Sequence, residues 1–174
     1  MKGHVIISHG LESSPDATKA TALAQVAERL GWSHERPDYR TWDNDFSRGR
    51  LGDVEGRIMH LLSLARRVKA PLVLAGSSMG AFISARVSLE LPVRSLFLMA
   101  PPVKLEGFDV RLEAARVPTH IVHGWDDELI PALDVARWAQ ARRDQTVFVH
   151  DSHRLADHVH FCAGEFRRLL QGLA

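Results

Sequence analysis

The segment Leu72-Val73-Leu74-Ala75-Gly76-Ser77-Ser78-Met79-Gly80-Ala81 passes from one kind of pattern to another within ten residues. Residues 72–76 are almost continuously apolar and too few for a helix, which is typical of a strand buried on both faces of a parallel sheet. Residues 79–89 have the character of a helix. A strand that enters a helix through a turn between two glycines predicts an α/β fold.

The turn itself, Gly76-Ser77-Ser78-Met79-Gly80, matches the pattern G-x-S-x-G. In such a turn the serine backbone is strained, and the flanking positions approach other backbone so closely that only glycine fits. The helix amino terminus behind the serine supplies positive potential and free N–H donors. A chance glycine-serine turn and a phosphate loop are the alternatives. A phosphate loop favours lysine after the second glycine, and Ala81 stands there, so we predict Ser78 as a nucleophile.

Short apolar runs of the same kind recur along the chain and alternate with amphipathic segments. The further predicted strands are His4–Ser8, Ser95–Met99, Thr119–His123, Thr146–His150 and a weak outer strand, Ser33–Pro37. The predicted helices on the sheet cover 20–30, 54–68 and 155–173. Cys162 lies on the apolar stripe of the last helix, which favours a packing role. The alternation predicts a three-layer α/β/α sandwich with a mostly parallel sheet of about six strands.

Length and composition bound the possibilities further. The 174 residues, 45% of them hydrophobic and 25% charged, predict one globular domain spanning residues 1–174. With 22 basic and 21 acidic residues, the formal charge of +1 gives no broad field toward nucleic acid or a membrane. One cysteine permits neither an internal disulfide nor a zinc framework. The amino-terminal apolar run is too short for a signal peptide, so we expect a cytoplasmic protein. The oligomeric state stays open.

Acidic residues follow the strand predicted at 119–123. The segment His123-Gly124-Trp125-Asp126-Asp127-Glu128-Leu129-Ile130-Pro131 places three carboxylates in one turn. A carboxylate there can accept a hydrogen bond from the Nδ1–H of an imidazole and so fix the tautomer of the ring. Asp126, Asp127 and Glu128 compete for that role. A solvated acidic turn before a helix that begins near Pro131 is the alternative.

A histidine follows the last predicted strand. His153 lies in the loop before the terminal helix, where an imidazole can reach over the sheet edge. The neighbouring histidines fall in the flanking strand or helix and are weaker candidates: His150, His158 and His160. An isolated histidine is more often a surface or core residue. The order of Ser78, an acid after the penultimate strand and His153 after the last strand favours a catalytic base.

The chain resembles a small member of the α/β-hydrolase superfamily, whose triad runs serine, acid, histidine. The motifs that carry the resemblance span nearly the whole chain: Ser8-His9-Gly10-Leu11, Pro37-Asp38-Tyr39-Arg40, the G-x-S-x-G turn, and His123-Gly124 through Ile130-Pro131 with His153 downstream. The resemblance implies Asp127 as the acid rather than Asp126, because the family acid is the fifth residue of H-G-x-x-D-x-x-[VI]-P. It also implies backbone N–H groups of Leu11 and Met79 as oxyanion donors, although His9-Gly10 also suits a plain turn.

The implied activity is hydrolysis of a carboxylic ester or thioester of a small-molecule acyl substrate, with no metal or organic cofactor. A serine rather than an aspartate at position 78 argues against the dehalogenase branch. A serine peptidase or acyltransferase using the same triad and a non-catalytic protein-interaction module are the alternatives.

The chain also departs from the larger members of the superfamily. Their initial antiparallel hairpin has no counterpart, and the stretch between Ser78 and Asp127 leaves no room for a substantial cap domain. We expect an open site covered only by loops 38–52 and 101–112. The aromatic residues of these loops either line an acyl pocket or shield the core edge: Tyr39, Trp42, Phe46 and Phe108.

Overall fold

A six-stranded sheet forms the centre of the protein, which a computed structural model describes over residues 1–173. The strands are β1 (His4–Ser8), β2 (Ser33–Glu35), β3 (Leu72–Ser77), β4 (Ser95–Met99), β7 (Thr119–Gly124) and β8 (Gln145–Val149). Their order is β2-β1-β3-β4-β7-β8, and all neighbours pair in parallel. The chain moves outward to β2 and then returns to β3 on the other side of β1. The carboxyl ends of β1 and β3 therefore form a topological switch point, where ligands bind in open α/β sheets.

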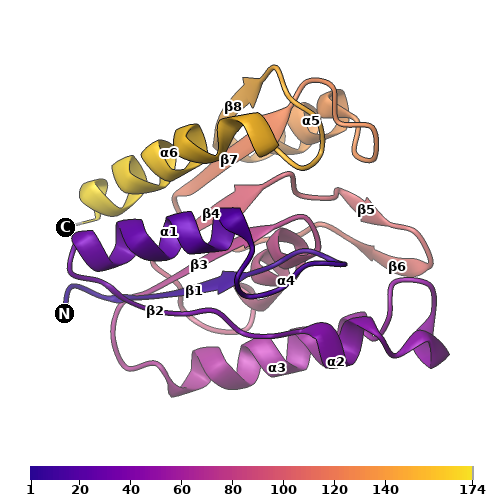
Figure 1. The fold of residues 1–174 in the computed structure, drawn as a ribbon, viewed down its shortest axis with the longest axis horizontal. Helices are drawn as coiled ribbons and strands as arrows, with labels where there is room; N and C mark the ends of the chain where they lie inside the picture. Colours follow the sequence, from indigo (N-terminus) through magenta and orange to yellow (C-terminus); the bar gives the residue numbers. More distant parts are fainter. Residues whose placement is uncertain (174) are drawn as a thin grey trace.

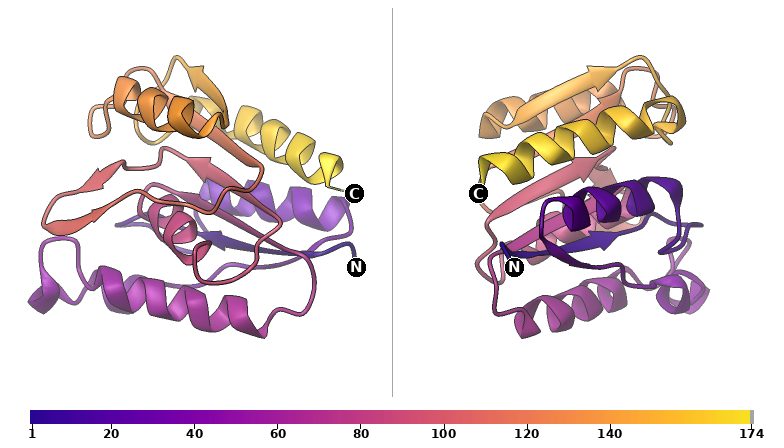
Figure 2. Two further views of the ribbon diagram at one scale, coloured as in Figure 1. Left: turned by 180° about the vertical axis from the view of Figure 1, so that it is seen from behind. Right: turned by 60° about the vertical axis from the view of Figure 1, so that its left-hand side comes forward.

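Helices cover both faces of this sheet and give the predicted three layers (Figure 1). One face carries α1 (Thr18–Arg29) and α6 (Val159–Gly172). The other face carries α3 (Val54–Arg67), α4 (Met79–Val87) and α5 (Ala132–Arg142), which lie on the near side of the sheet in the left view of Figure 2. The predicted sandwich is confirmed.

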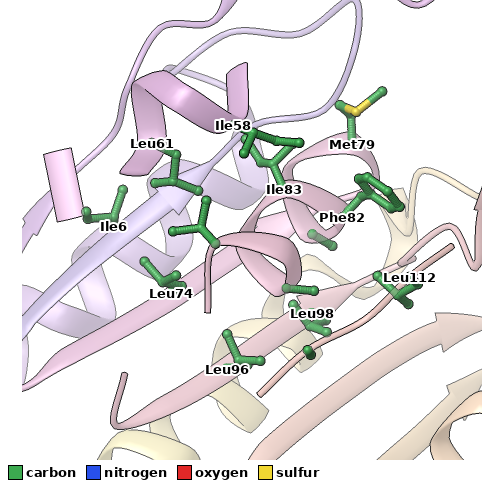
Figure 3. Packing of buried hydrophobic residues seen from close by; sticks show 14 of the residues in the cluster. Ile6, Ile58, Leu61, Leu74, Met79, Phe82, Ile83, Leu96, Leu98 and Leu112 are labelled. Atoms are coloured by element: carbon green, nitrogen blue, oxygen red, sulfur yellow. The ribbon is translucent and has the colours of Figure 1, made fainter. Parts of the chain in front are cut away.

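Two hydrophobic cores fill the space between the layers. Successive residues of one strand point to opposite faces, so Ile6 packs toward α3 and α4 while Val5 packs toward α1 and α6. Figure 3 shows Ile6 and Leu74 of the sheet against Leu61 of α3. Strands buried on both faces need apolar residues at every position, which explains the continuous apolar runs.

Two segments predicted as loops contain secondary structure. Residues 101–112 form an antiparallel hairpin of β5 (Lys104–Leu105) and β6 (Phe108–Arg111), which turns at Gly107 with φ of 76°. Residues 38–52 contain α2 (Arg40–Asp43) and the 3-10 turn η1 (Phe46–Arg48). The helices and strands in both segments are too short to show a clear hydrophobic period, so no local pattern predicted them.

Several predicted boundaries shift by a few residues. The strand predicted at 146–150 runs from 145 to 149, so His150 lies just beyond it. The last helix begins at Val159, after a 3-10 turn η2 (Ala156–His158), instead of at 155. Cys162 is buried in this helix, as predicted. Within residues 1–173, no helix has the length and apolar character needed to cross a membrane.

Candidate active site

Ser78 occupies the turn between β3 and α4 in a conformation that side chains rarely adopt, with φ of 53° and ψ of −117°. Its N–H donates to the carbonyl of Met99 in β4 at 2.9 Å, and its own carbonyl accepts from the N–H of Phe82 in α4 at 3.0 Å. The neighbouring strand and the helix therefore hold the strained backbone in place from both sides. The hydroxyl stands at the carboxyl end of the central strand.

The two glycines of the turn are explained by close backbone approach. A Cβ atom on Gly76 would overlap the backbone of Gly80 and Ala81, and a Cβ atom on Gly80 would overlap the carbonyl group of Ser8. No flexible side chain is available to move away at either position. The G-x-S-x-G pattern thus reflects the packing of this turn, residues 76–80, which we call the elbow, against its own helix and against the end of β1.

The structure brings Ser78, His153 and Asp127 together. His153 Nε2 lies 2.8 Å from the Ser78 hydroxyl oxygen, and His153 Nδ1 lies 2.7 Å from Asp127 Oδ2. Both contacts have hydrogen-bond length, and each of the three residues follows a different strand of the sheet. The arrangement can move a proton from the serine to the imidazole while the carboxylate holds the ring.

Asp127 is buried, and its second oxygen is also occupied. Oδ1 accepts from the N–H groups of Leu129 at 2.9 Å and Ile130 at 2.7 Å. Burial opposes ionisation of this carboxyl. The hydrogen bonds from His153 and from the two N–H groups outweigh that effect and lower its pKa below the usual value. Asp127 is therefore ionised at neutral pH. His123 donates from Nε2 to the Ile130 carbonyl at 2.9 Å and supports the same turn.

The other two acids of the turn have different contacts. Glu128 Oε2 accepts from the backbone N–H of His153 at 3.1 Å, so it holds the histidine backbone but does not contact the ring. Asp126 lies at the surface, 3.3 Å from Nδ1 of the exposed His150. The carboxylate that contacts the imidazole is thus that of Asp127.

Asp151 fastens the loop that carries His153. Its carboxylate accepts from the N–H groups of Ser152 at 2.7 Å and Asp157 at 3.0 Å, and from His158 Nδ1 at 2.9 Å. His158 therefore has a structural partner within the loop. These bonds cross the loop from end to end and limit its freedom.

The loop that carries Leu11 and the first turn of α4, which carries Met79, both lie beside the serine. Met79 begins α4, where the first N–H groups have no partner within the helix. A Cβ atom on Gly10, the residue before Leu11, would lie 3.3 Å from the Ser77 carbonyl oxygen and 3.5 Å from Ser78 Cβ. The loop after β1 thus packs directly against the elbow. Among residues 1–173, neither the Leu11 nor the Met79 N–H donates to another protein group.

A buried polar cluster that the sequence patterns did not predict lies under this loop. Arg57 of α3 is fully buried and pairs with Asp43 of α2 through Nε and, at 2.7 Å, through Nη2. It also reaches the backbone of the His9-Gly10 loop. A usable signal existed, because Arg57 stands on the apolar stripe of α3 between Val54 and Leu61.

Comparison with known proteins decides the family. A protein of the alpha/beta hydrolase superfamily from Xanthomonas campestris pv. campestris has 55% sequence identity over 98% of this chain and 99% of its own, with a TM-score of 0.96. The chain belongs to the alpha/beta hydrolase superfamily. An alpha-beta serine hydrolase homologue from Coxiella burnetii is 28% identical over 98% of this chain and 86% of its own, with a TM-score of 0.79.

A more distant superfamily structure shares the fold. It is a serine hydrolase without lid from Xanthomonas campestris, 20% identical over 97% of this chain and 80% of its own, with a TM-score of 0.72. No family model and no curated protein matches the chain. The relatives are described as hydrolases, which supports a hydrolase here.

The aromatic residues of the two covering segments differ in their burial and contacts. Tyr39 is buried and its hydroxyl lies 2.8 Å from the Ser8 hydroxyl, and Trp42 packs against the same core, so both shield the core edge. Phe46 is exposed. Phe108 of the hairpin packs edge-on against Phe82 with ring centroids 6.0 Å apart.

Proposed function

We propose that this superfamily member is a serine hydrolase that cleaves a carboxylic ester or thioester through an acyl-enzyme. The observation that carries the proposal is the continuous pair of hydrogen bonds from Ser78 to His153 and from His153 to Asp127, at 2.8 and 2.7 Å. A neutral imidazole that donates from Nδ1 to a carboxylate has its lone pair on Nε2, facing the serine hydroxyl.

In the first half of the reaction, Ser78 Oγ attacks the carbonyl carbon as its proton passes to His153 Nε2. The carbonyl electrons move onto oxygen, and the N–H groups of Leu11 and Met79 stabilise that oxyanion. The intermediate collapses, the bond to the leaving alcohol or thiol breaks, and His153 returns the proton to the leaving group. The acyl group remains on Ser78.

In the second half, water attacks the acyl carbon and gives a proton to His153. The new tetrahedral intermediate expels Ser78, which regains its proton from the imidazole, and the carboxylic acid is released. Asp127 stays ionised throughout, which its lowered pKa favours, and stabilises the imidazolium that forms in each half.

A cavity between the two covering segments is our candidate for the acyl group. It has a volume of about 480 Å³ and is lined by residues 48–55 and 106–108. One wall, Phe108, packs on Phe82, whose N–H bonds to the Ser78 carbonyl. The other wall includes Val54, one helical turn before Arg57. The Phe108 wall thus connects the cavity to α4, the helix that follows Ser78, and the volume suits a small ligand.

Activity-based labelling tests the proposal. A fluorophosphonate probe is expected to label the wild type, and p-nitrophenyl acetate is expected to be hydrolysed above the buffer rate. Ser78→Ala should lose both reactions while its circular dichroism spectrum stays unchanged. Labelling of Ser78→Ala to the same extent as the wild type would contradict the assignment of Ser78 as the nucleophile. A folded wild type without labelling or turnover would favour the protein-interaction module, and release of an amine from an aminoacyl amide would favour a peptidase.

A further inference from the structure

Arg57 makes an unusual set of contacts for a residue of a core-facing helix. Its Nη1 donates to the His9 carbonyl at 2.9 Å and its Nη2 to the Gly10 carbonyl at 3.2 Å. Asp43 accepts from Nε and Nη2, and the guanidinium carbon lies 4.5 Å from the centre of the Tyr39 ring. One buried cation thereby joins α3, α2 and the loop after β1.

Stability alone is a weak reason for this arrangement. Removing a guanidinium and a carboxylate from water carries a large free-energy cost for each ion, and a well-packed apolar pair of the same volume is often at least as stable. Ion pairs of this kind are best justified where they fix one geometry among several. The geometry that Arg57 fixes is that of two consecutive peptide groups, those after His9 and Gly10.

The second of these peptide groups carries the Leu11 N–H. No cis peptide bond occurs in residues 1–173, so the Gly10 carbonyl and the Leu11 N–H point in opposite directions from one rigid plane. The groups that donate hydrogen bonds to the Gly10 oxygen therefore set the direction of the Leu11 N–H. The Gly10 oxygen accepts from Arg57 Nη2 and, at 2.7 Å, from His9 Nδ1.

His9 serves as a neutral donor in this cluster. Its Nε2 accepts from the Tyr39 N–H at 3.0 Å, which places the ring proton on Nδ1, toward the Gly10 carbonyl. Burial lowers the pKa of His9 below its usual value, so the neutral ring persists at neutral pH. Arg57 adds a permanent positive charge to the same carbonyl. Charge-assisted bonds to a peptide oxygen polarise the peptide and strengthen its N–H as a donor.

We propose that Arg57, held by Asp43, is a positioning residue for the oxyanion site: it orients and polarises the Gly10–Leu11 peptide so that the Leu11 N–H faces the developing oxyanion. This inference rests on the proposed hydrolase function. Arg57 acts through the peptide and does not touch the substrate. Loss of one oxyanion donor lowers kcat about 10²–10³-fold, so imperfect orientation of Leu11 is expected to cost about 10–100-fold.

A thionoester substrate separates this role from general damage. Its sulfur is a weak hydrogen-bond acceptor, so a thionoester gains little from an oxyanion site. We expect Arg57→Met to lower kcat for an oxoester about 10–100-fold with little change in KM, and to leave hydrolysis of the matched thionoester nearly unchanged. Arg57→Lys retains the charge but loses the planar fork, so it should show the same selective loss of oxoester hydrolysis. This second variant can be assayed if Arg57→Met does not fold.

Arg142 provides a matched control. It is also largely buried, pairs with Asp144 at 2.6 Å, and holds the carbonyls of Ala114 and Ala115 at 2.8 and 2.9 Å, near the amino-terminal ends of β7 and β8. Arg142→Met removes the same kind of interaction far from the elbow and should change both substrates equally. An equal loss on both substrates in the Arg57 variants would overturn the proposal.

The Leu11 amide gives a readout that does not depend on turnover. In ¹⁵N–¹H spectra, Arg57→Lys should shift the Leu11 resonance and leave that of Met79 in place, whereas Arg142→Met should shift neither. An unmoved Leu11 resonance would overturn the inference. If the wild type hydrolyses neither ester, the proposed function fails and the catalytic part of this inference with it, while the spectra still decide whether Arg57 orients the peptide.

Discussion

Asp127 holds His153 with one carboxylate oxygen and its own turn with the other. The Oδ2 contact to His153 Nδ1 is 2.7 Å long, and the Oδ1 contacts to the N–H groups of Leu129 and Ile130 are 2.9 and 2.7 Å long. The bonds to Oδ1 thereby fix the rotamer of the carboxylate independently of the imidazole. The placement of the carboxylate and its negative charge can therefore be tested by separate experiments.

Asp127→Asn is expected to preserve the fold and abolish most of the activity. The side-chain oxygen can still accept from the two backbone N–H groups, but an amide NH₂ facing Nδ1 favours the tautomer that carries its proton on Nε2. That tautomer cannot accept the Ser78 proton, and kcat should fall about 10⁴-fold. Steady-state hydrolysis of p-nitrophenyl acetate measures the loss. Asp126→Asn, at the exposed neighbouring acid, should retain wild-type kcat; a similar loss there would contradict the assignment.

Acid unfolding should report the lowered pKa of Asp127. A carboxyl whose pKa is lower in the folded state adds stability that is fully present above the unfolded-state pKa of about 3.9. That stability is lost as the pH falls through the folded-state pKa. Urea unfolding between pH 7 and 3 should therefore show a stability gap between wild type and Asp127→Asn that narrows only at the acid end. A gap that is constant with pH would contradict the ionised state.

The three residues of the proposed proton relay were predictable because topology orders them. In a parallel sheet all strands end at one edge, so Ser78, Asp127 and His153, each just after a strand, had to approach one another. The choice of Asp127 over Asp126 and Glu128 needed the family spacing. Charge alone did not separate three adjacent carboxylates.

Topology did not predict the Arg57 cluster, whose one sequence signal was the place of Arg57 on the apolar stripe of α3. An arginine in an amphipathic helix is usually solvated, and its burial depends on Asp43, which lies in a segment without periodicity. The hairpin at 104–111 was missed for a related reason: its strands are short, and alternate residues of β6 are exposed. Elements that form because of tertiary contacts have little signal in the local hydrophobic pattern of the sequence.

Substitution by alanine should change the free energy of unfolding very differently at an elbow glycine and at a helical glycine where the added Cβ atom would contact no other element. Gly80→Ala places a methyl group against the Ser8 carbonyl, and we expect a loss of about 3 kcal/mol or more in unfolding free energy, or no folded protein. Gly164→Ala, in α6 where no atom beyond the adjacent residues and the backbone of the same helix lies within 4 Å of the new carbon, should gain about 0.5–1 kcal/mol. Urea unfolding checks both. A mild effect of Gly80→Ala would refute the packing explanation of the motif.

Cys162 should be chemically inert in the folded protein. Burial raises the pKa of its thiol to about 12, and the reactive thiolate is therefore scarce at pH 8. Ellman's reagent should titrate no thiol in native protein and one thiol per chain in 6 M guanidinium chloride. Rapid reaction of the native protein would contradict the packing role assigned to Cys162.

The cavity between residues 48–55 and 106–108 should set the acyl-chain preference. Leu51 lines it and packs partly against the core, so Leu51→Trp should fill the space. We expect kcat/KM for p-nitrophenyl octanoate to fall about tenfold or more while the value for the acetate changes little, because only the longer chain needs the filled volume. Leu133→Trp, at an exposed position of α5, adds the same ring away from the cavity and should leave the ratio unchanged. If both chain lengths respond equally to Leu51→Trp, the acyl group binds elsewhere.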